Sequence, residues 1–149
     1  MLDRLMDFLS GTNEEPGIVQ TDLDLAVAAL LVEAARMDDV FDDAERATIE
    51  SLLAKRFELS ESDAATLVAR ADERVQASAQ YFRFTHEIVQ RMSEEERGGV
   101  IEMLWRVAYA DGELDPHEDA LIRQIAGLIH VTDRDRARAR QRALGTPQV

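Results

Sequence analysis

Two matched triplets of acidic residues are the groups in this chain whose types and spacing could do chemistry. Each triplet spans a short loop between two apolar segments, and a constant offset of 73 residues relates the two copies. The triplets are Asp38, Asp42 and Glu45, followed by Asp111, Asp115 and Glu118. Carboxylates and loop carbonyls are the ligands that Ca²⁺, Mg²⁺ and Mn²⁺ prefer. These six acids are therefore a candidate metal site.

Helix capping is a second interpretation of four of these acids. Asp42 is suited to the N-cap of a helix with Glu45 at its third position, and Asp115 and Glu118 repeat this arrangement around Pro116. An N-cap aspartate accepts a hydrogen bond from a first-turn amide, the glutamate reaches back, and proline favours the first helical position. Such a cap stabilises a helix by about 0.5–2 kcal/mol. Capping alone would account for these four acids without a ligand.

Capping of the following helix does not explain Asp38 and Asp111. Both lie where an incoming helix is expected to end, and a carboxylate there is unfavourable by about 0.3–1 kcal/mol because the helix dipole is negative. One explanation is that each side chain turns back to loop amides, as in Asx turns. The other is that each completes a cation site with the acids four and seven residues later. The sequence leaves both explanations open.

The elements that must position these acids are helices. Apolar residues recur at helical spacing, and capping residues precede several of the stripes. The stripes lie within residues 23–34, 49–57, 67–75, 81–92, 100–108 and 122–129. Expected N-caps are Thr21, Asp42, Ser60, Ser78 or a neighbour, Ser93, Asp115, and Thr132 or Asp133. We predict an all-α, single-domain bundle of seven to eight helices built from two related helix–loop–helix halves, with a pseudo-twofold arrangement and residues 60–92 as connecting helices.

Composition and charge exclude several classes of protein. The chain has no cysteine, which excludes disulfides and zinc–thiolate sites, and its longest apolar run of eight residues is far short of the roughly 20 that span a membrane. A net charge of −13 disfavours nucleic acid and anionic lipid and favours cations or basic partners. Five arginines follow Thr132, and we expect them to fold back on the acidic surface or to be solvated. With no secretory signal evident, we expect a cytoplasmic protein.

No catalytic arrangement can be argued from the remaining polar residues. The histidines His86, His117 and His130 are isolated from one another in sequence, and His117 is expected at the surface in the first turn of its helix. The acids occur with turn residues and not with a nucleophile or a phosphate-binding loop. We therefore expect no enzymatic activity and no organic cofactor.

The second acidic loop resembles the TerB-like (tellurite-resistance protein B) family. The string Ala-Tyr-Ala-Asp-Gly-Glu-Leu-Asp-Pro-His-Glu over residues 108–118 is a close match, whereas the first loop has Asp39 where glycine is usual. The similarity covers about residues 20–135. It implies an all-helical domain of two related halves with the acidic loops on one surface. It also implies a link to tellurite resistance and stress systems, and a divalent-metal role for the six acids.

From the residues and the resemblance together we expect three segments. These are a short helix and loop over 1–20, a TerB-like helical domain over 21–133, and an Arg-rich helix and tail over 134–149. The expected function is a non-enzymatic stress-associated module that binds a divalent cation, protein partners or both through its acidic loops, with a membrane-protein complex at the inner membrane among the partners considered. The alternative is a ligand-free interaction scaffold or co-chaperone-like domain in which the acids only cap helices. The oligomeric state is left open.

Overall fold

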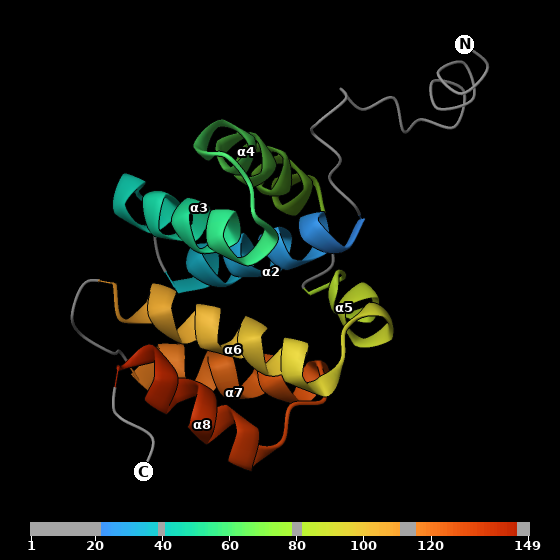
Figure 1. The fold of residues 1–149 in the computed structure, drawn as a ribbon, viewed down its shortest axis with the longest axis vertical. Helices are drawn as coiled ribbons and strands as arrows, with labels where there is room; N and C mark the ends of the chain where they lie inside the picture. The colour runs from blue at the N-terminus through green and yellow to red at the C-terminus, as the bar shows by residue number, and fades with distance from the viewer. Residues whose placement is uncertain (1–21, 39–40, 79–81, 111–115, 146–149) are drawn as a thin grey trace.

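The described residues fold into seven α-helices and no strand, which confirms the all-α prediction (Figure 1). The computed structural model describes residues 22–38, 41–78, 82–110 and 116–145. The helices are α2 (Asp22–Asp38), α3 (Asp43–Phe57), α4 (Glu61–Ala77), α5 (Thr85–Arg91), α6 (Glu94–Ala108), α7 (Pro116–Leu128) and α8 (Asp133–Ala143). The short helix predicted within residues 1–20 lies outside the described residues.

The order and spacing of the helices repeat over three helices in each half. A shift of 73 residues places the start of α3 on the start of α7, and it places the starts of α2 and α4 within one residue of the starts of α6 and α8. Within the halves, α2 packs on α4 and α6 packs on α8. Figure 1 shows α2–α4 as one layer and α6–α8 as the other, with α5 at one side. The prediction that residues 60–92 are connecting helices is therefore wrong for α4, which is an integral part of the first half.

The two halves are joined in a reciprocal manner. Helix α2 contacts α6 at the centre, while α3 contacts α6 and α7 contacts α2. Such an exchange of matching contacts is what a twofold relation between two similar units produces. The predicted pseudo-twofold arrangement thus agrees with the packing of the helices.

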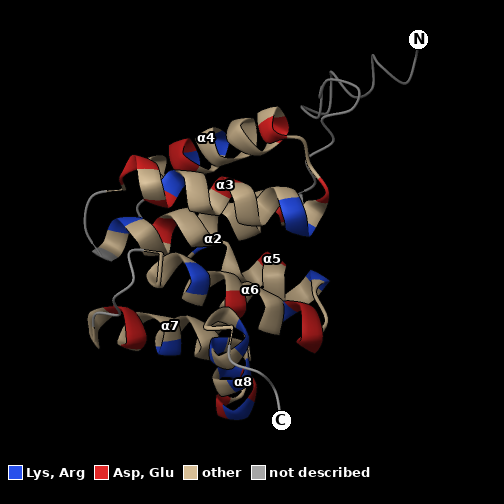
Figure 2. Ribbon diagram, turned by 60° about the vertical axis from the view of Figure 1, so that its left-hand side comes forward, with Lys and Arg blue, Asp and Glu red and all other residues tan. Residues whose placement is uncertain are grey.

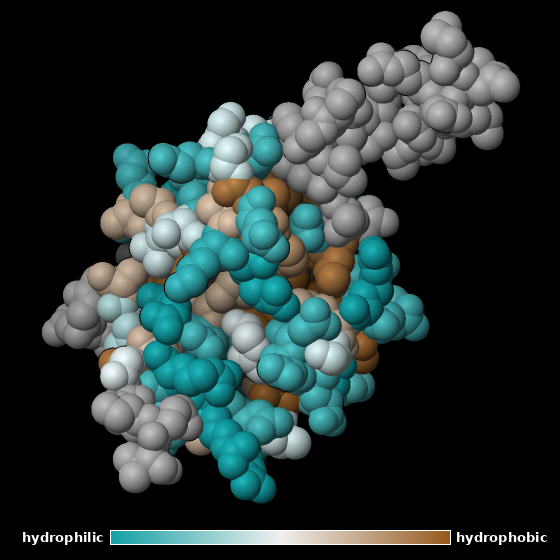
Figure 3. Space-filling view, viewed as in Figure 1, coloured by the Kyte–Doolittle hydropathy of each residue, from teal (hydrophilic) through white to brown (hydrophobic). Residues whose placement is uncertain are grey.

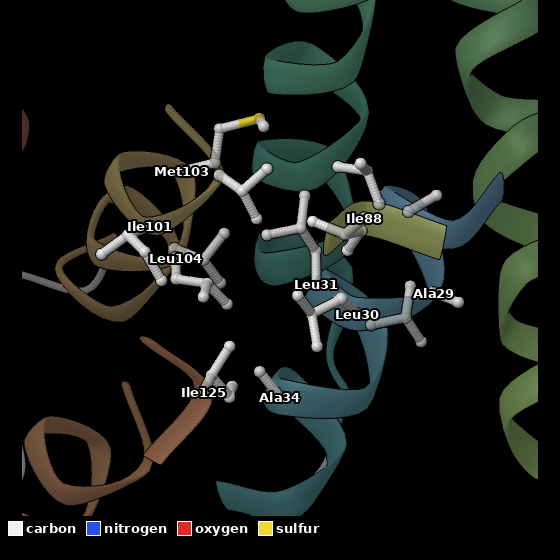
Figure 4. Close-up of a cluster of buried hydrophobic side chains, with 14 of the residues drawn as sticks. Ala29, Leu30, Leu31, Ala34, Ile88, Ile101, Met103, Leu104 and Ile125 are labelled. Carbon is white, nitrogen blue, oxygen red and sulfur yellow. The ribbon is translucent and has the colours of Figure 1, made fainter. Parts of the chain in front are cut away.

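Apolar side chains from both halves meet in one core. In Figure 4, Leu30 and Leu31 of α2 face Ile101 and Leu104 of α6, and Ile125 of α7 lies close by. All of these side chains are buried, and Leu30, Leu31, Ile101 and Ile125 are fully buried. Burial of each such side chain contributes about 1.5–3 kcal/mol. This shared core fixes the described helices of the two halves relative to each other.

Matched caps define the helix boundaries that the sequence predicted. Ser60, Ser93 and Thr132 each accept a hydrogen bond from the amide three residues later, as expected of N-caps. At the other ends, α3 and α7 are followed by left-handed residues, Glu58 and His130. In both cases the next amide donates to a carbonyl five residues back, the Schellman arrangement. The second helix of each helix–loop–helix unit therefore ends in the same way, and a side-chain N-cap opens the helix that follows it.

Helix α5 is shorter than the sequence pattern predicted. Ser78 does not open it, because Ser78 is the C-cap of α4. Phe82 adopts a left-handed conformation, with φ of 59°, and its N–H donates to the carboxylate of Glu33 at 2.7 Å. A left-handed residue interrupts a helix, and Thr85 then begins α5. The cause is a bond to α2, 49 residues away in the chain, which local periodicity cannot reveal.

Candidate functional site

The first acidic loop leads into α3 through a complete capping box. Asp42 Oδ1 accepts from the Glu45 N–H at 2.8 Å, and Glu45 Oε1 accepts from the Asp42 N–H at 3.3 Å. The capping interpretation of these two acids is confirmed. The return bond is long for an N–H···O contact.

The second acidic loop is described only from its helix onward. Pro116 is the first residue of α7, as predicted, and Glu118 lies in the first turn. His117 beside it is exposed, which confirms its expected place at the surface. Asp111 and Asp115 lie outside the described residues. Asp38 ends α2, but its side chain is not described either, so the two explanations of Asp38 and Asp111 both stay predictions.

The third acids of the two triplets meet at the junction of the halves. Glu45 of α3 and Glu118 of α7 line the same small cavity, of about 20 Å³. The rest of its wall is apolar and comes from α2, α6 and α7: Ala34, Ala35, Leu104, Val107, Ala108, Leu121 and Ile122. A space of that size holds about one water molecule. The fold therefore brings one acid from each loop to a common point with room for a single small species.

A larger hollow adjoins this point. It has a volume of about 250 Å³ and is lined by Met37, His117, Glu118, Ala120, Leu121 and Gln124. Met37 is 44% exposed, which is high for a large apolar side chain in a chain whose core is well filled. Methionine adapts readily to different contacts. The surface beside Glu118 thus combines an acid with an apolar contact point.

An aromatic and ionic cluster holds the first loop against α4. The guanidinium carbons of Arg36 and Arg46 lie 5.6 and 4.7 Å from the centroid of the Phe41 ring. Both arginines also donate to Asp72 of α4, Arg36 at 2.6 and 3.1 Å and Arg46 at 3.3 Å. The hydrogen bond from Arg36 lowers the pKa of Asp72 below its usual value, partial burial opposes this, and Arg46 adds to the lowering. The cluster orients the helix end that precedes Asp42.

Sequence reasoning missed this cluster. Asp72 lies one position beyond the apolar residue Ala71 on the buried side of α4, and only 11% of its side chain is exposed. The position of Asp72 beside an apolar stripe indicated that its carboxylate would be buried and would therefore need a partner. The partners could not be identified, because Arg36 and Arg46 are 36 and 26 residues away in sequence.

A different cluster occupies the corresponding place in the second half. Tyr109 of the α6 C-terminus stacks on the buried Trp105, with ring centroids 6.0 Å apart, and its hydroxyl accepts from Arg140 Nε of α8 at 3.1 Å. Arg142 Nε donates to Glu102 at 2.7 Å. Two of the C-terminal arginines thus fold back on the body, as expected, and Figure 2 shows the basic bands of α8 beside α6.

The described donors are suitable for a hard cation but do not form a complete site. Carboxylate oxygens such as those of Glu45 and Glu118 suit Ca²⁺, Mg²⁺ or Mn²⁺. Over the ranges that the structure describes, no group of three histidine, cysteine or acidic side chains is close enough to hold a metal. A site of the predicted composition would need Asp38, Asp111 and Asp115 in addition.

The comparisons identify the family. The family model described as tellurite resistance protein TerB matches residues 24–141, nearly the whole of the described chain. No curated protein and no solved structure matched the chain. None of the helices in the described part has the length and apolar character that crossing a bilayer requires. The chain therefore belongs to the TerB family of tellurite resistance proteins.

Proposed function

We propose that this TerB-family chain is a non-enzymatic module that binds a divalent cation, a basic protein partner or both through its two acidic loops. The observation that carries the proposal is the position of Glu45 and Glu118, which come from different halves and line one cavity. In this proposal the module works in the cytoplasm as part of a stress-response complex, which can include a membrane protein. Its role in tellurite resistance is indirect.

Charge supports a cationic ligand. The chain carries a net charge of −13, and such a field raises the local concentration of cations around it. The acids proposed to hold a metal are Asp38, Asp42, Glu45, Asp111, Asp115 and Glu118, with Glu45 and Glu118 bridging the halves. A bound divalent cation would supply positive charge that offsets the repulsion between the two loops.

The surroundings of the acids support a binding role over catalysis. Apart from Glu45 and Glu118, the cavity is lined by alanine, valine, leucine and isoleucine. Hydrocarbon side chains of this kind can exclude water but cannot transfer protons or attack a substrate. The adjoining Met37 gives a partner protein an apolar contact beside the acids.

A ligand-free scaffold is the second candidate, and the capping box favours it. Asp42 and Glu45 bond each other's backbone amides, so their place at the start of α3 has a structural reason. If the same holds for α7, the acids need no ligand. The two candidates differ in their response to cations.

Thermal unfolding with Ca²⁺, Mg²⁺ and Mn²⁺ separates the candidates. A cation at 100 times its Kd should stabilise the chain by about 2.7 kcal/mol, and Glu45→Gln and Glu118→Gln should abolish that shift. Glu96→Gln is a matched control, because Glu96 completes a capping box at the start of α6 and therefore loses the same kind of cap without touching the loops. It should retain the full shift.

Absence of any shift at millimolar concentrations of all three cations would remove the metal role. If, in addition, Asp38→Asn and Asp111→Asn have the same melting temperature as the wild type, the ligand-free scaffold is favoured. A shift that Glu96→Gln abolishes as strongly as Glu45→Gln would assign the effect to helix capping and would contradict a site at the loops.

A further inference from the structure

A third hollow, larger than the two beside the acidic loops, runs between α6 and α8. We call it the α6–α8 groove. Its volume is about 870 Å³, and the end of α3 closes one side. Its lining includes Glu94, Glu95, Gly98, Gly99, Asp135 and Arg138. In the view of Figures 1 and 3, hydrophilic surface covers this face over α6 and α8.

Two adjacent glycines lie along this groove in the interior of α6. A Cβ atom at Gly99 would meet nothing within 4 Å, and one at Gly98 would meet only the end of the Arg142 side chain, at 3.9 Å. Neither glycine has a positive φ. The chain's own packing therefore has room for alanine at both positions, and alanine is the better helix former. Glycine in such a place is typical of close approach by another backbone.

The charges around the groove are unbalanced. Arg56 pairs with Glu96 at 3.6 Å, and Arg142 pairs with Glu102 at 2.7 Å. After these pairs, the lining holds three further carboxylates, Glu94, Glu95 and Asp135, against one further cation, Arg138. The remaining excess is negative, so an occupant of complementary charge is basic.

The dimensions suit a polypeptide segment. From Glu94 to Glu102 the groove follows α6 for somewhat over two turns, which is about 12 Å at the helical rise. An extended chain covers that length with about four residues. The volume also lies in the range of about 300–1,000 Å³ that is usual for binding clefts.

We propose that the α6–α8 groove docks a basic segment of a partner protein. The segment's backbone lies against Gly99, and its lysine or arginine side chains lie among Glu94, Glu95 and Asp135. This surface is separate from the acidic loops, because none of its lining residues belongs to either triplet. The groove would therefore allow the module to engage a protein while the loops hold a cation.

The test is an NMR titration of the full chain, labelled with ¹⁵N, with a blocked eight-residue peptide of alternating lysine and alanine. The proposal predicts that shift changes concentrate in the amides of residues 94–102 and 135–142. Changes that spread evenly over all acidic faces, or that concentrate at residues 36–45 and 116–122, would overturn it. The second pattern would also identify the acidic loops as a site for basic partners.

Side chains added at the glycines sharpen the test. Gly99→Leu should weaken peptide binding at least tenfold while the helix content stays unchanged. Gly127→Leu is the matched control, because Gly127 is a helical glycine with nothing within 4 Å of an added Cβ, and it should leave binding unchanged. Equal effects of the two substitutions would overturn the proposal. Gly99→Ala should raise the melting temperature, which separates the loss of binding from a loss of folding.

Charge is tested in the same way. Glu94→Gln with Glu95→Gln should weaken peptide binding several-fold more than Glu61→Gln with Glu73→Gln, a pair of exposed acids on α4. The two double variants remove the same net charge. If they weaken binding equally, the peptide responds only to the overall charge of the protein, and the groove is not its site.

Discussion

The two halves of the molecule share one arrangement of helices but hold their third helices by different means. Helix α4 of the first half buries Ala64, Leu67, Val68 and Ala71, whereas α8 of the second half buries only Ala139. In place of apolar burial, α8 uses arginines that contact Trp105, Tyr109 and Glu102 of α6. The comparison shows that one backbone arrangement can be stabilised either by the hydrophobic effect or by polar and aromatic contacts.

One pair of equivalent positions, Arg36 and Tyr109, shows this difference between the halves directly. Arg36 and Tyr109 are related by the 73-residue offset, and each bonds from the end of the central helix to the third helix of its half. Arg36 donates to an acid on α4, while Tyr109 accepts from an arginine on α8. Both side chains therefore link the central helix to the third helix of their half, but the hydrogen-bond donor lies on the central helix in the first half and on the third helix in the second.

The largest expected effect comes from the aromatic contact. Trp105→Ala should destabilise the fold by about 3–5 kcal/mol, because Trp105 is 1% exposed and packs beneath α8. Its equivalent in the first half is the fully buried Val32, and Val32→Ala should cost about 1–3 kcal/mol. Urea unfolding measures both. Equal losses would show that the second half does not depend on its aromatic residue more than the first depends on its aliphatic one.

Asp72→Asn should have the next largest effect. It removes a carboxylate that accepts from two arginines, and we expect a loss of about 1–3 kcal/mol, reduced because both arginines are about one third exposed. The pKa of Asp72 is lowered in the folded state, first by the bond from Arg36. Its contribution is therefore complete above the unfolded pKa, about 3.9, and is lost as pH falls through the folded value.

Unfolding measured from pH 7 to pH 2 tests whether the contribution of Asp72 to stability is lost as the pH falls. The wild type should lose more stability than Asp72→Asn over the range below pH 4. Parallel curves for the two proteins would mean that the carboxylate is not held by the arginines in the folded state.

Glu102→Gln should have a smaller effect, of at most about 1 kcal/mol, because Arg106 and Arg142 are more exposed than the partners of Asp72. Burial raises the pKa of Glu102, and bonds from Arg142 and Arg106 together outweigh it, so that the pKa is lowered. High salt should weaken the same ion pairs and should therefore destabilise α8 in particular. Hydrogen exchange in 1 M NaCl should accelerate more in α8 than in α4, because salt screens exposed ion pairs and α4 is held mainly by buried apolar side chains. Equal acceleration in both helices would contradict the contrast between the halves.

The smallest effect concerns Glu33, whose equivalent in the second half is Arg106. Glu33 is 5% exposed, and burial raises its pKa, which the bond from the Phe82 N–H only partly offsets. The folded state therefore favours the neutral form of Glu33 more than the unfolded state does. The resulting stabilisation is complete below the unfolded pKa, about 4.3, and is lost as pH rises through the higher folded value. Glu33→Gln should abolish this dependence and raise stability at pH 7, measured by thermal unfolding. A lower melting temperature of the variant at pH 7 would contradict this assignment.

Local signals in the sequence were sufficient to predict most of the helices. Apolar spacing and the caps at Asp42, Ser60, Ser93 and Thr132 each predicted a helix start that the structure contains. The repeat predicted two related halves because similar sequences fold alike. The start of α5 could not be predicted in this way, since it depends on Glu33 bonding the Phe82 amide from another helix.

The candidate site was predicted in composition but not in arrangement. The repeat identified Glu45 and Glu118 as equivalent acids, but only the packing of α3 and α7 against the opposite halves shows that they line one cavity. The cluster of Phe41, Arg36, Arg46 and Asp72 was missed because its members lie on three segments of the chain. Pairing over such distances is decided by tertiary structure and not by spacing.

Calorimetric titration of Mn²⁺ into the full chain, with Glu45→Gln and Glu118→Gln in parallel, tests most directly whether the two halves act as one site. The account predicts one ion bound per chain and a loss of binding in either variant, because one acid from each half lines the common cavity. Two independent ions per chain, with each variant losing only one of them, would contradict it, as would binding that neither substitution alters.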